Sequence, residues 1–195
     1  ARARASCRLG AELVRSGKIG EIREIRVKAP NSRPGGSRVP KPVPEGLQYD
    51  LWLGPAPWRD YSGCPDVGHN WFHVYDYALG FIAGWGAHPL DLLVWAFDTH
   101  LAGNWEVEGT GAIDLGGAND AIHNWDARIQ FANGVKMSYW ASGLPKEEHP
   151  RLAKLGNYAQ LIGTEGWVAV YYADVACEPE SLRSIVLGPD DVHLP

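Results

Sequence analysis

The sequence predicts an α+β (α/β) fold, in which a large, mainly antiparallel open sheet carries helices packed on one of its faces. Two observations support this prediction. Apolar residues recur at helical spacing in the first half of the chain, whereas in the second half they alternate with polar residues, as strands with one buried face require. A chain of 195 residues can bury a sizeable core, and we expect one domain over residues 1–195.

The chain opens with a predicted helix over residues 6–20, whose apolar stripe contains Leu9 and Leu13 and which Gly17 can end. Residues 24–29 then alternate polar and apolar side chains, which predicts a strand with one face in water.

Residues 89–97 give the strongest helical pattern in the sequence. Pro89 suits the first turn of a helix. The apolar residues fall at i, i+3, i+4 and i+7 and predict one buried stripe: Leu90, Leu93, Val94 and Phe97.

The second half of the chain predicts the sheet. Residues 105–113, 124–131 and 135–141 alternate with period two, and Asn133-Gly134 between the last two is a hairpin signal. A further pair of strands, 158–162 and 167–172, flanks a turn at residues 163–166. We expect these strands to form a sheet with one polar and one apolar face.

Residues 30–60 contain seven prolines, which exclude a regular helix or a central strand. The segment is also rich in aromatic and aliphatic residues, so it does not have the composition of a solvated linker. We interpret it as an ordered excursion that aromatic side chains hold against the body of the protein.

Composition excludes several classes of function. The net charge is −5 and no basic stripe is present, so neither nucleic acid nor an anionic membrane is predicted as a partner. No apolar run is long enough to span a membrane. Cys7, Cys64 and Cys177 are odd in number and widely spaced, which favours packed thiols in a reducing compartment and a cytoplasmic location.

The segment 80–91 is the strongest candidate for a catalytic site. Glycines run directly into the predicted helix, whose first turn holds His88 and Asp91, three residues apart and therefore on one face. Glycines let a ligand approach the backbone closely, and a histidine can transfer a proton near neutral pH. Spacing alone also permits His88 to be an N-cap and Asp91 to be an acid that complements the helix dipole.

A second candidate lies just before it, at residues 68–77. Trp71, His73 and Tyr75 could line one wall of a binding site, because their side chains combine apolar surfaces with polar groups. His69 and His73 are four residues apart, but no HExxH pattern accompanies them, and we predict no metal site. Ordinary packing of these aromatic residues remains an alternative.

The Gly109-Thr110-Gly111 segment superficially resembles a dinucleotide loop. It lies in a predicted strand, and Asp114 stands where the third glycine belongs, so we predict no nucleotide loop there.

Four motifs, taken together and in order, resemble the glucose–fructose oxidoreductase / inositol dehydrogenase / rhizopine catabolism (Gfo/Idh/MocA) family. They are a helix-to-strand opening at 13–24, Tyr-Asp-Leu-Trp-Leu-Gly-Pro-Ala-Pro at 49–57, Gly-Trp-Gly-Ala-His-Pro-Leu-Asp at 84–91 and Gly-Thr-Glu-Gly at 163–166. The third resembles the family's active-site motif, although Gly84 stands where an aspartate is usual. The family's Glu-Lys-Pro motif does not occur in this chain.

This resemblance implies the substrate-binding C-terminal domain of an NAD(P)-dependent oxidoreductase that acts on a sugar or cyclitol hydroxyl. His88 would take the family's catalytic histidine role, and Asp91 would bind the substrate. NAD or NADP would be bound by a Rossmann domain outside this chain, and a homo-oligomer would form through the sheet. We expect its outer face to carry Trp140 or Tyr172.

Two other functions remain open at this stage. Related families cleave glycosides by transient oxidation of the sugar with NAD, and a non-catalytic carbohydrate-binding or assembly module could keep the sheet without the chemistry. Because the sequence contains no phosphate-binding glycine loop, we expect the chain by itself to bind no dinucleotide tightly and to catalyse no turnover.

Overall fold

A computed structural model describes residues 2–63, 70–97, 103–146, 148–153, 155–171 and 174–195. Its centre is a seven-stranded sheet in the order β2-β3-β4-β1-β5-β6-β7. The strands are β1 (Ile22–Ala29), β2 (Trp105–Ala112), β3 (His123–Phe131), β4 (Lys136–Ala141), β5 (Tyr158–Gly163), β6 (Trp167–Tyr171) and β7 (Asp174–Glu178). Strands β1 and β4 pair in parallel and the other neighbours are antiparallel, which confirms the predicted mainly antiparallel sheet.

The helices are mostly short. They are α1 (Ala5–Arg15), α2 (Tyr49–Leu53), η1 (Asn70–His73), α3 (Tyr75–Ala78), α4 (Phe81–Gly84), α5 (Ala87–Phe97), α6 (Pro150–Ala153) and η3 (Glu180–Ser184). The sequence patterns identified α1 and α5, whereas the remaining helices are too short to show a periodic signal. Among the described residues, no helix has the length and apolar character needed to cross a membrane.

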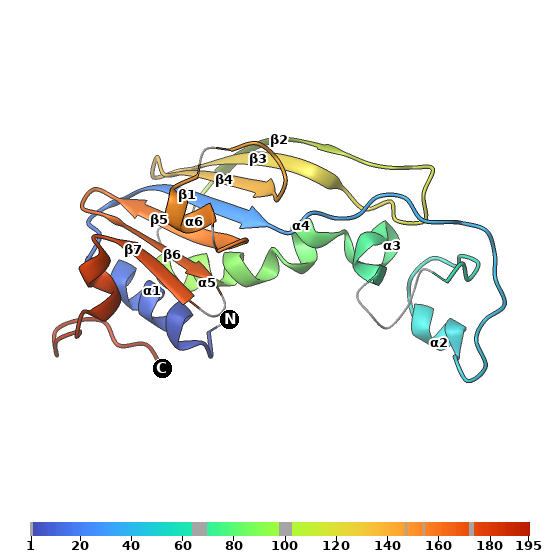
Figure 1. Cartoon of the computed structure of the whole chain (residues 1–195), viewed down its shortest axis with the longest axis horizontal. Helices are drawn as coiled ribbons and strands as arrows, with labels where there is room; N and C mark the ends of the chain where they lie inside the picture. Colours follow the sequence, from blue (N-terminus) through green and yellow to red (C-terminus); the bar gives the residue numbers. More distant parts are fainter. Residues whose placement is uncertain (1, 64–69, 98–102, 147, 154, 172–173) are drawn as a thin grey trace.

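Helices α1 and α5 lie together against one face of the sheet, which we call the inner face (Figure 1). The strand register places Met137, Ile25, Leu161 and Val168 in one row across this face, and all four are buried. In β1, β3 and β7 buried side chains alternate with less buried ones, as the sequence pattern predicted. The prediction of a buried apolar face is wrong for β2, which is exposed along its whole length because it is the edge strand furthest from α1.

The prediction of a buried stripe on α5 is correct for two of its four residues. Leu93 and Phe97 are buried, but Leu90 and Val94 are exposed, and Leu92 takes part in the core instead. The reason is that α5 packs against α1 as well as against the sheet, so its buried arc is wider and rotated relative to a single stripe.

The opposite, outer face is not the open apolar surface that we expected. Trp140 is buried there with Tyr158 beneath Leu152 of α6. Ion pairs from Lys28 to Glu148 and from Lys146 to Asp126 hold this covering segment in place. The expectation that Trp140 is exposed is therefore wrong, because the β4–β5 connection folds back over it. Tyr172, like Cys64 and His69, lies outside the described residues.

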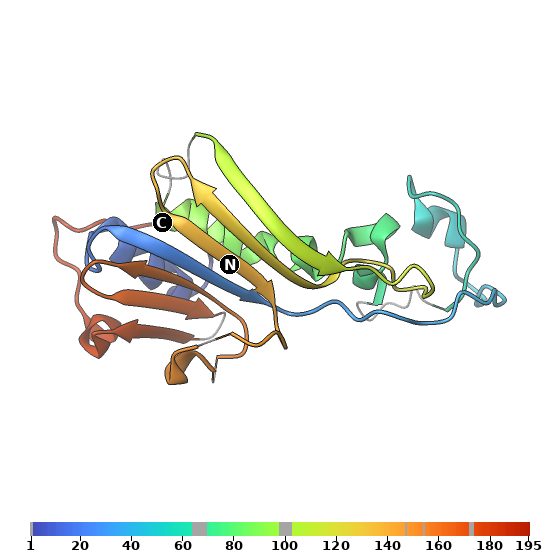
Figure 2. The same cartoon turned by 90° about the horizontal axis from the view of Figure 1, so that it is seen from above.

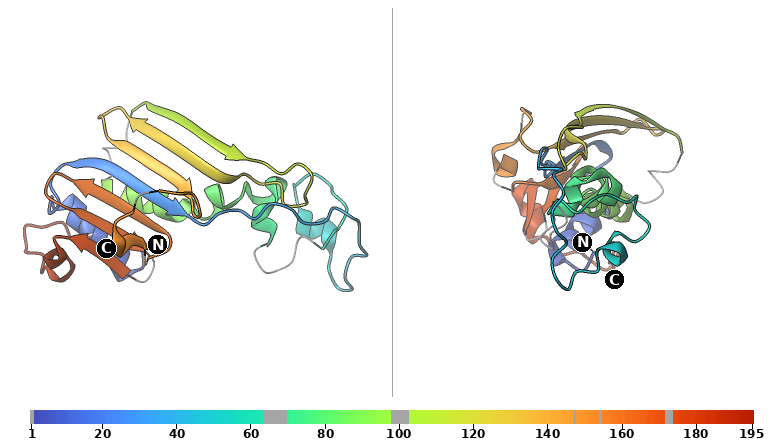
Figure 3. Two further views of the ribbon diagram at one scale, coloured as in Figure 1. Left: turned by 45° about the horizontal axis from the view of Figure 1, so that its top comes forward. Right: turned by 90° about the vertical axis from the view of Figure 1, so that its right-hand side faces the viewer.

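Residues 30–62, which we call the arm, project from one end of the sheet, away from the core (Figures 1, 2 and 3). The arm is irregular except for the single turn of α2, which lies between prolines. At its start, Asn119 N donates to the carbonyl oxygen of Gly35 (2.8 Å), and a side chain at Gly117 would clash with the Gly35 backbone. The β2–β3 connection therefore holds the arm by close backbone contact.

We predict that Leu93→Ala lowers the free energy of unfolding by about 2–5 kcal/mol, because Leu93 is 1% exposed and its removal leaves a cavity between α5 and the sheet. Val94→Ala is the matched control on the same helix. Val94 is 50% exposed, so its loss should change the unfolding free energy by about 0.5 kcal/mol or less. Urea denaturation measures both, and equal effects would contradict the orientation of α5.

Candidate functional site

The glycines before α5 are required by packing. A Cβ on Gly84 would lie 2.6 Å from two ring carbons of Phe72, and one on Gly86 would collide with the Ile82 carbonyl and the Tyr139 hydroxyl. These contacts fill the space on the side-chain side of both glycines, so a ligand cannot approach either backbone from that side. Phe72 thus fills the space that a side chain at position 84 would occupy, where the family's motif usually has an aspartate. The sequence did not indicate this role of Phe72.

His88 lies in the first turn of α5 and is exposed. Its backbone N–H donates to the Trp85 carbonyl oxygen at 3.0 Å. Because α5 begins at Ala87, His88 is inside the helix, and the N-cap alternative does not describe it. Its side chain borders a cavity of about 30 Å³ that Cys7 and Leu92 also line, which is enough for water and too small for a sugar ring. Any ring-sized ligand must therefore approach His88 from the solvent side.

Asp91 lies one turn further along α5, and Arg2 contacts its carboxylate with two nitrogens. The Arg2 Nη2–Asp91 Oδ1 distance is 2.6 Å and the Nε–Oδ2 distance is 3.0 Å. The Arg2 guanidinium also lies 5.6 Å from the ring centroid of Trp95, which is on the same helix. The hydrogen bond from Arg2 lowers the pKa of Asp91, and the charge on His88 acts weakly in the same direction. Asp91 is therefore an ionised hydrogen-bond acceptor at neutral pH.

The residues before α4 form an aromatic layer. Trp71 stacks on Phe72 with centroids 3.9 Å apart, Phe72 stacks on Phe81 at 5.6 Å, and the His73 ring meets Phe81 edge-on at 5.0 Å. Because Phe72 also contacts Gly84, this layer adjoins the segment that leads into His88.

His73 is 4% exposed, and its Nδ1 accepts a hydrogen bond from Arg33 N at 3.3 Å. Burial lowers the pKa of His73, and the charge on Arg33 lowers it further, so the ring is neutral at pH 7. Its contacts connect the start of the arm to α4, a structural role that its sequence context did not distinguish from ligand binding.

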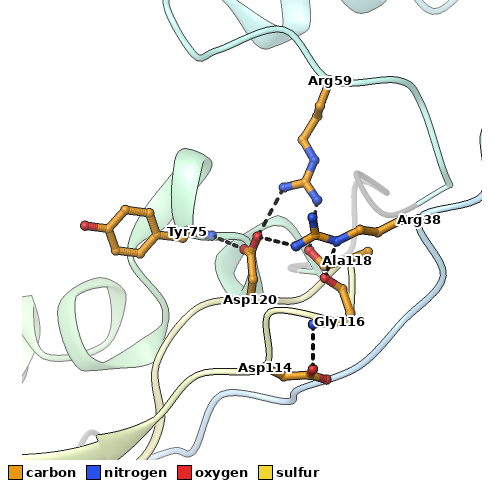
Figure 4. Close-up of polar contacts among 8 residues, drawn as sticks. Arg38, Arg59, Tyr75, Asp114, Gly116, Ala118 and Asp120 are labelled. Carbon is orange, nitrogen blue, oxygen red and sulfur yellow. Dashed lines mark hydrogen bonds and ion pairs between the residues drawn. The ribbon is translucent and has the colours of Figure 1, made fainter.

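Tyr75 stands apart from this layer. Its backbone N–H donates to Asp120 Oδ1 at 2.9 Å, whereas its exposed ring points away from Asp120 (Figure 4). The structure thus joins Trp71 and His73, through Phe72 and Phe81, to the segment that leads into His88, and places Tyr75 at the start of α3, with its ring exposed.

Asp120 is the centre of an ion-pair network that the sequence did not indicate (Figure 4). Arg38 Nη2 lies 3.0 Å from its carboxylate and Arg59 Nη1 lies 3.8 Å from it. The same arginines donate to the carbonyl oxygens of Gly117 (2.6 Å) and Ala118 (3.2 Å). This network joins the arm, the β2–β3 connection and the first residue of α3.

No group of three His, Cys, Asp or Glu side chains suited to a metal ion occurs within the part of the chain that the structure describes. Gly109 and Gly111 lie inside β2, as predicted, and not at a strand-to-helix turn. This segment therefore does not form the strand-to-helix turn that holds the phosphates of a dinucleotide.

A sequence profile of the Gfo/Idh/MocA type, described as the oxidoreductase family, C-terminal alpha/beta domain, matches residues 35–148. No curated protein matches the chain. Solved structures do resemble it in fold. One is the aldose-aldose oxidoreductase of Caulobacter crescentus complexed with glycerol, with a TM-score of 0.54 and 14% identity over 90% of this chain and 42% of that one.

Two further structures resemble the chain at a TM-score of 0.50. The WlbA dehydrogenase of Bordetella pertussis, in complex with NADH and UDP-GlcNAcA, is 20% identical over 88% of this chain and 40% of its own. GenD2 from gentamicin A biosynthesis, in complex with NAD, is 18% identical over 87% of this chain and 37% of its own. The chain therefore spans about two fifths of the length of these proteins.

We predict that Arg2→Ala raises the pKa of Asp91 toward its ordinary value, because the hydrogen bond from Arg2 is the main cause of its depression. The folded-state pKa is depressed, so the stability that the pair provides is present above the ordinary carboxyl pKa of about 4 and is lost as the pH falls through the folded-state pKa. Carboxyl-carbon NMR titration measures the shift. Arg8→Ala is the control, and an unchanged Asp91 pKa in Arg2→Ala would show that the pair does not form in solution.

Proposed function

Because the chain belongs to the Gfo/Idh/MocA oxidoreductase family, as a C-terminal alpha/beta domain, we propose that it supplies the substrate-binding side of an NAD(P)-dependent oxidoreductase. The substrate would be a sugar or cyclitol that is oxidised or reduced at a hydroxyl-bearing carbon. The observation that carries this proposal is the exposed His88 at the first turn of α5, one turn from the ionised Asp91. Fold neighbours named as an aldose-aldose oxidoreductase and as a dehydrogenase bound to UDP-GlcNAcA support the substrate class.

In this proposal His88 accepts the proton of the substrate hydroxyl. Removal of a hydride from a sugar carbon leaves a hydroxyl proton that needs an acceptor, and an imidazole titrates close to the working pH. Asp91, which is ionised, would accept a hydrogen bond from a second hydroxyl, in competition with Arg2. Since α5 is fixed by the core on two sides, both side chains are held on a rigid element.

The aromatic residues before α4 would form the other wall of the substrate site. Trp71 offers a half-buried ring, and Tyr75 offers an exposed ring with a hydroxyl. His73 would support this wall from behind through its contact with Phe81. The nicotinamide cofactor would be held by a nucleotide-binding domain outside this chain.

We further propose that two copies associate through the outer face of the sheet. A groove of about 780 Å³ on this face is lined by acidic side chains from β2, Glu106 and Glu108, and by basic ones from β3 and β4, Arg128 and Lys136. A two-fold axis across such a patch would bring opposite charges together, as a self-complementary interface requires.

We predict that His88→Ala lowers kcat by about 10²–10⁴-fold, the usual contribution of a general acid–base group, in the longer protein that also contains the nucleotide-binding domain. Asp91→Asn should mainly raise KM. His149→Ala, an exposed histidine beside Trp167, is the control and should leave both constants unchanged. Steady-state rates and thermal melts are measured on the same samples. If His88→Ala turns over at the parental rate, the assigned site is wrong.

We predict that light scattering at micromolar concentration reports a dimer and that Arg128→Glu weakens it at least about 10-fold, because the substitution places like charges opposite one another. Arg8→Glu, on α1 at the inner face, is the matched charge reversal and should leave the dimer intact. A monomeric parent chain, or equal effects of the two variants, would contradict association through the outer face.

A further inference from the structure

The arm contains an aromatic cluster built around a buried tyrosine. Tyr49 is buried, and its ring stacks on Trp52 (centroids 6.1 Å apart, planes at 15°) and meets Trp58 edge-on at 5.8 Å. Tyr61 packs edge-on against the same ring at 5.4 Å. The Tyr49 hydroxyl donates to the Arg59 carbonyl oxygen at 3.0 Å, so the polar end of the central ring has a partner. The cluster is therefore an ordered unit, although the backbone around it is irregular.

Its two tryptophans nevertheless face solvent. Trp58 is 69% exposed and Trp52 is 38% exposed. Single exposed apolar side chains are common and need no explanation. Here, however, the two rings are held by one buried tyrosine, so their orientation is set before any ligand arrives. Such preorganisation reduces the entropy lost on binding.

The cluster is also fixed relative to the proposed substrate site. Trp52 meets Tyr77 of α3 edge-on at 5.1 Å. Arg59, next to Trp58, is bonded to Ala118 and ion-paired with Asp120, the residue that receives the backbone N–H of Tyr75. The tryptophans are thus attached to the short helix that follows Trp71 and His73.

The surrounding side chains indicate the chemistry of the ligand. The same two short segments carry exposed polar residues that are neighbours of Tyr49 and Tyr61 in the sequence: Gln48, Asp50 and Asp60. The core of a protein–protein interface is depleted in charged residues such as Asp50 and Asp60. A sugar ring, in contrast, has an apolar C–H face that stacks on an indole and hydroxyls that donate to carboxylates and amides.

We propose that Trp58 and Trp52 form a second carbohydrate-binding subsite, so that the substrate has at least two sugar rings, as an oligosaccharide or a glycoconjugate. The ring that reacts lies at His88 and the further ring stacks on the arm. The assignment of the substrate rests on the proposed function, whereas glycan binding by the arm does not.

The test uses the chain itself with cello-, malto- and chitohexaose and the three matching monosaccharides as probes. Saturation-transfer NMR and calorimetry measure binding. We expect at least one hexasaccharide to bind about 10-fold more tightly than its monosaccharide. Loss of one stacking ring in Trp58→Ala should weaken that binding about 5- to 10-fold, and Trp58→Phe should restore most of it. Trp105→Ala removes a comparably exposed tryptophan from the edge strand β2 and should change nothing.

Failure of every hexasaccharide to bind, or equal binding by Trp58→Ala and Trp105→Ala, would overturn the subsite. So would a change of oligomeric state in Trp58→Ala without a loss of glycan affinity, since the cluster would then be a protein interface. A different result would contradict the proposed function without contradicting the subsite. If Trp58-dependent glycan binding persists while the longer protein oxidises no sugar, the subsite stands and the oxidoreductase assignment falls.

Discussion

Burial of the inner face of the sheet is the constraint on which the candidate site depends. The apolar row from Met137 through Ile25 to Leu161 crosses three adjacent strands, and leaving such a surface in water costs about 25 cal/mol for each Å². Helices α1 and α5 cover it, and because α5 also packs on α1, it cannot rotate or slide without opening the core. His88 is therefore positioned by core packing along the rest of its helix.

The segment leading into α5 contacts the sheet and thereby fixes this helix relative to it. Tyr139, on the inner face of β4, donates its hydroxyl to the Ile82 carbonyl at 2.6 Å in the space that the missing side chain of Gly86 leaves. Burial raises the pKa of this hydroxyl, so it remains a donor at every physiological pH. On the other side, Phe72 fills the space beside Gly84. The glycines that look like a ligand-binding loop thus serve to bring a strand, an aromatic layer and a helix into contact.

The arm depends on a different kind of interaction. Ordering each residue of an irregular segment costs roughly 1–2 kcal/mol, and the arm has no ladder of backbone hydrogen bonds to offset that cost. Its order comes from the Asp120 network at one side and the Tyr49 cluster at the other. The Asp120 carboxylate is largely shielded. It accepts hydrogen bonds from Arg38 and from a backbone N–H and is ion-paired with Arg59, so its interactions are stronger than those of an exposed ion pair.

The sequence by itself determined the class of the fold, the extent of most strands and the two long helices, because side-chain periodicity follows from local backbone geometry. It also predicted that His88 and Asp91 lie together near the start of one helix and, through ordered motifs, indicated the family. Only the tertiary structure decided that Leu90 and Val94 stay exposed, that Trp140 is covered, that Phe72 fills the space at Gly84 and that Asp120 meets Arg38 and Arg59. These outcomes depend on which distant segments pack together, and a pairing between residues far apart in the chain leaves no periodic signal in a single sequence.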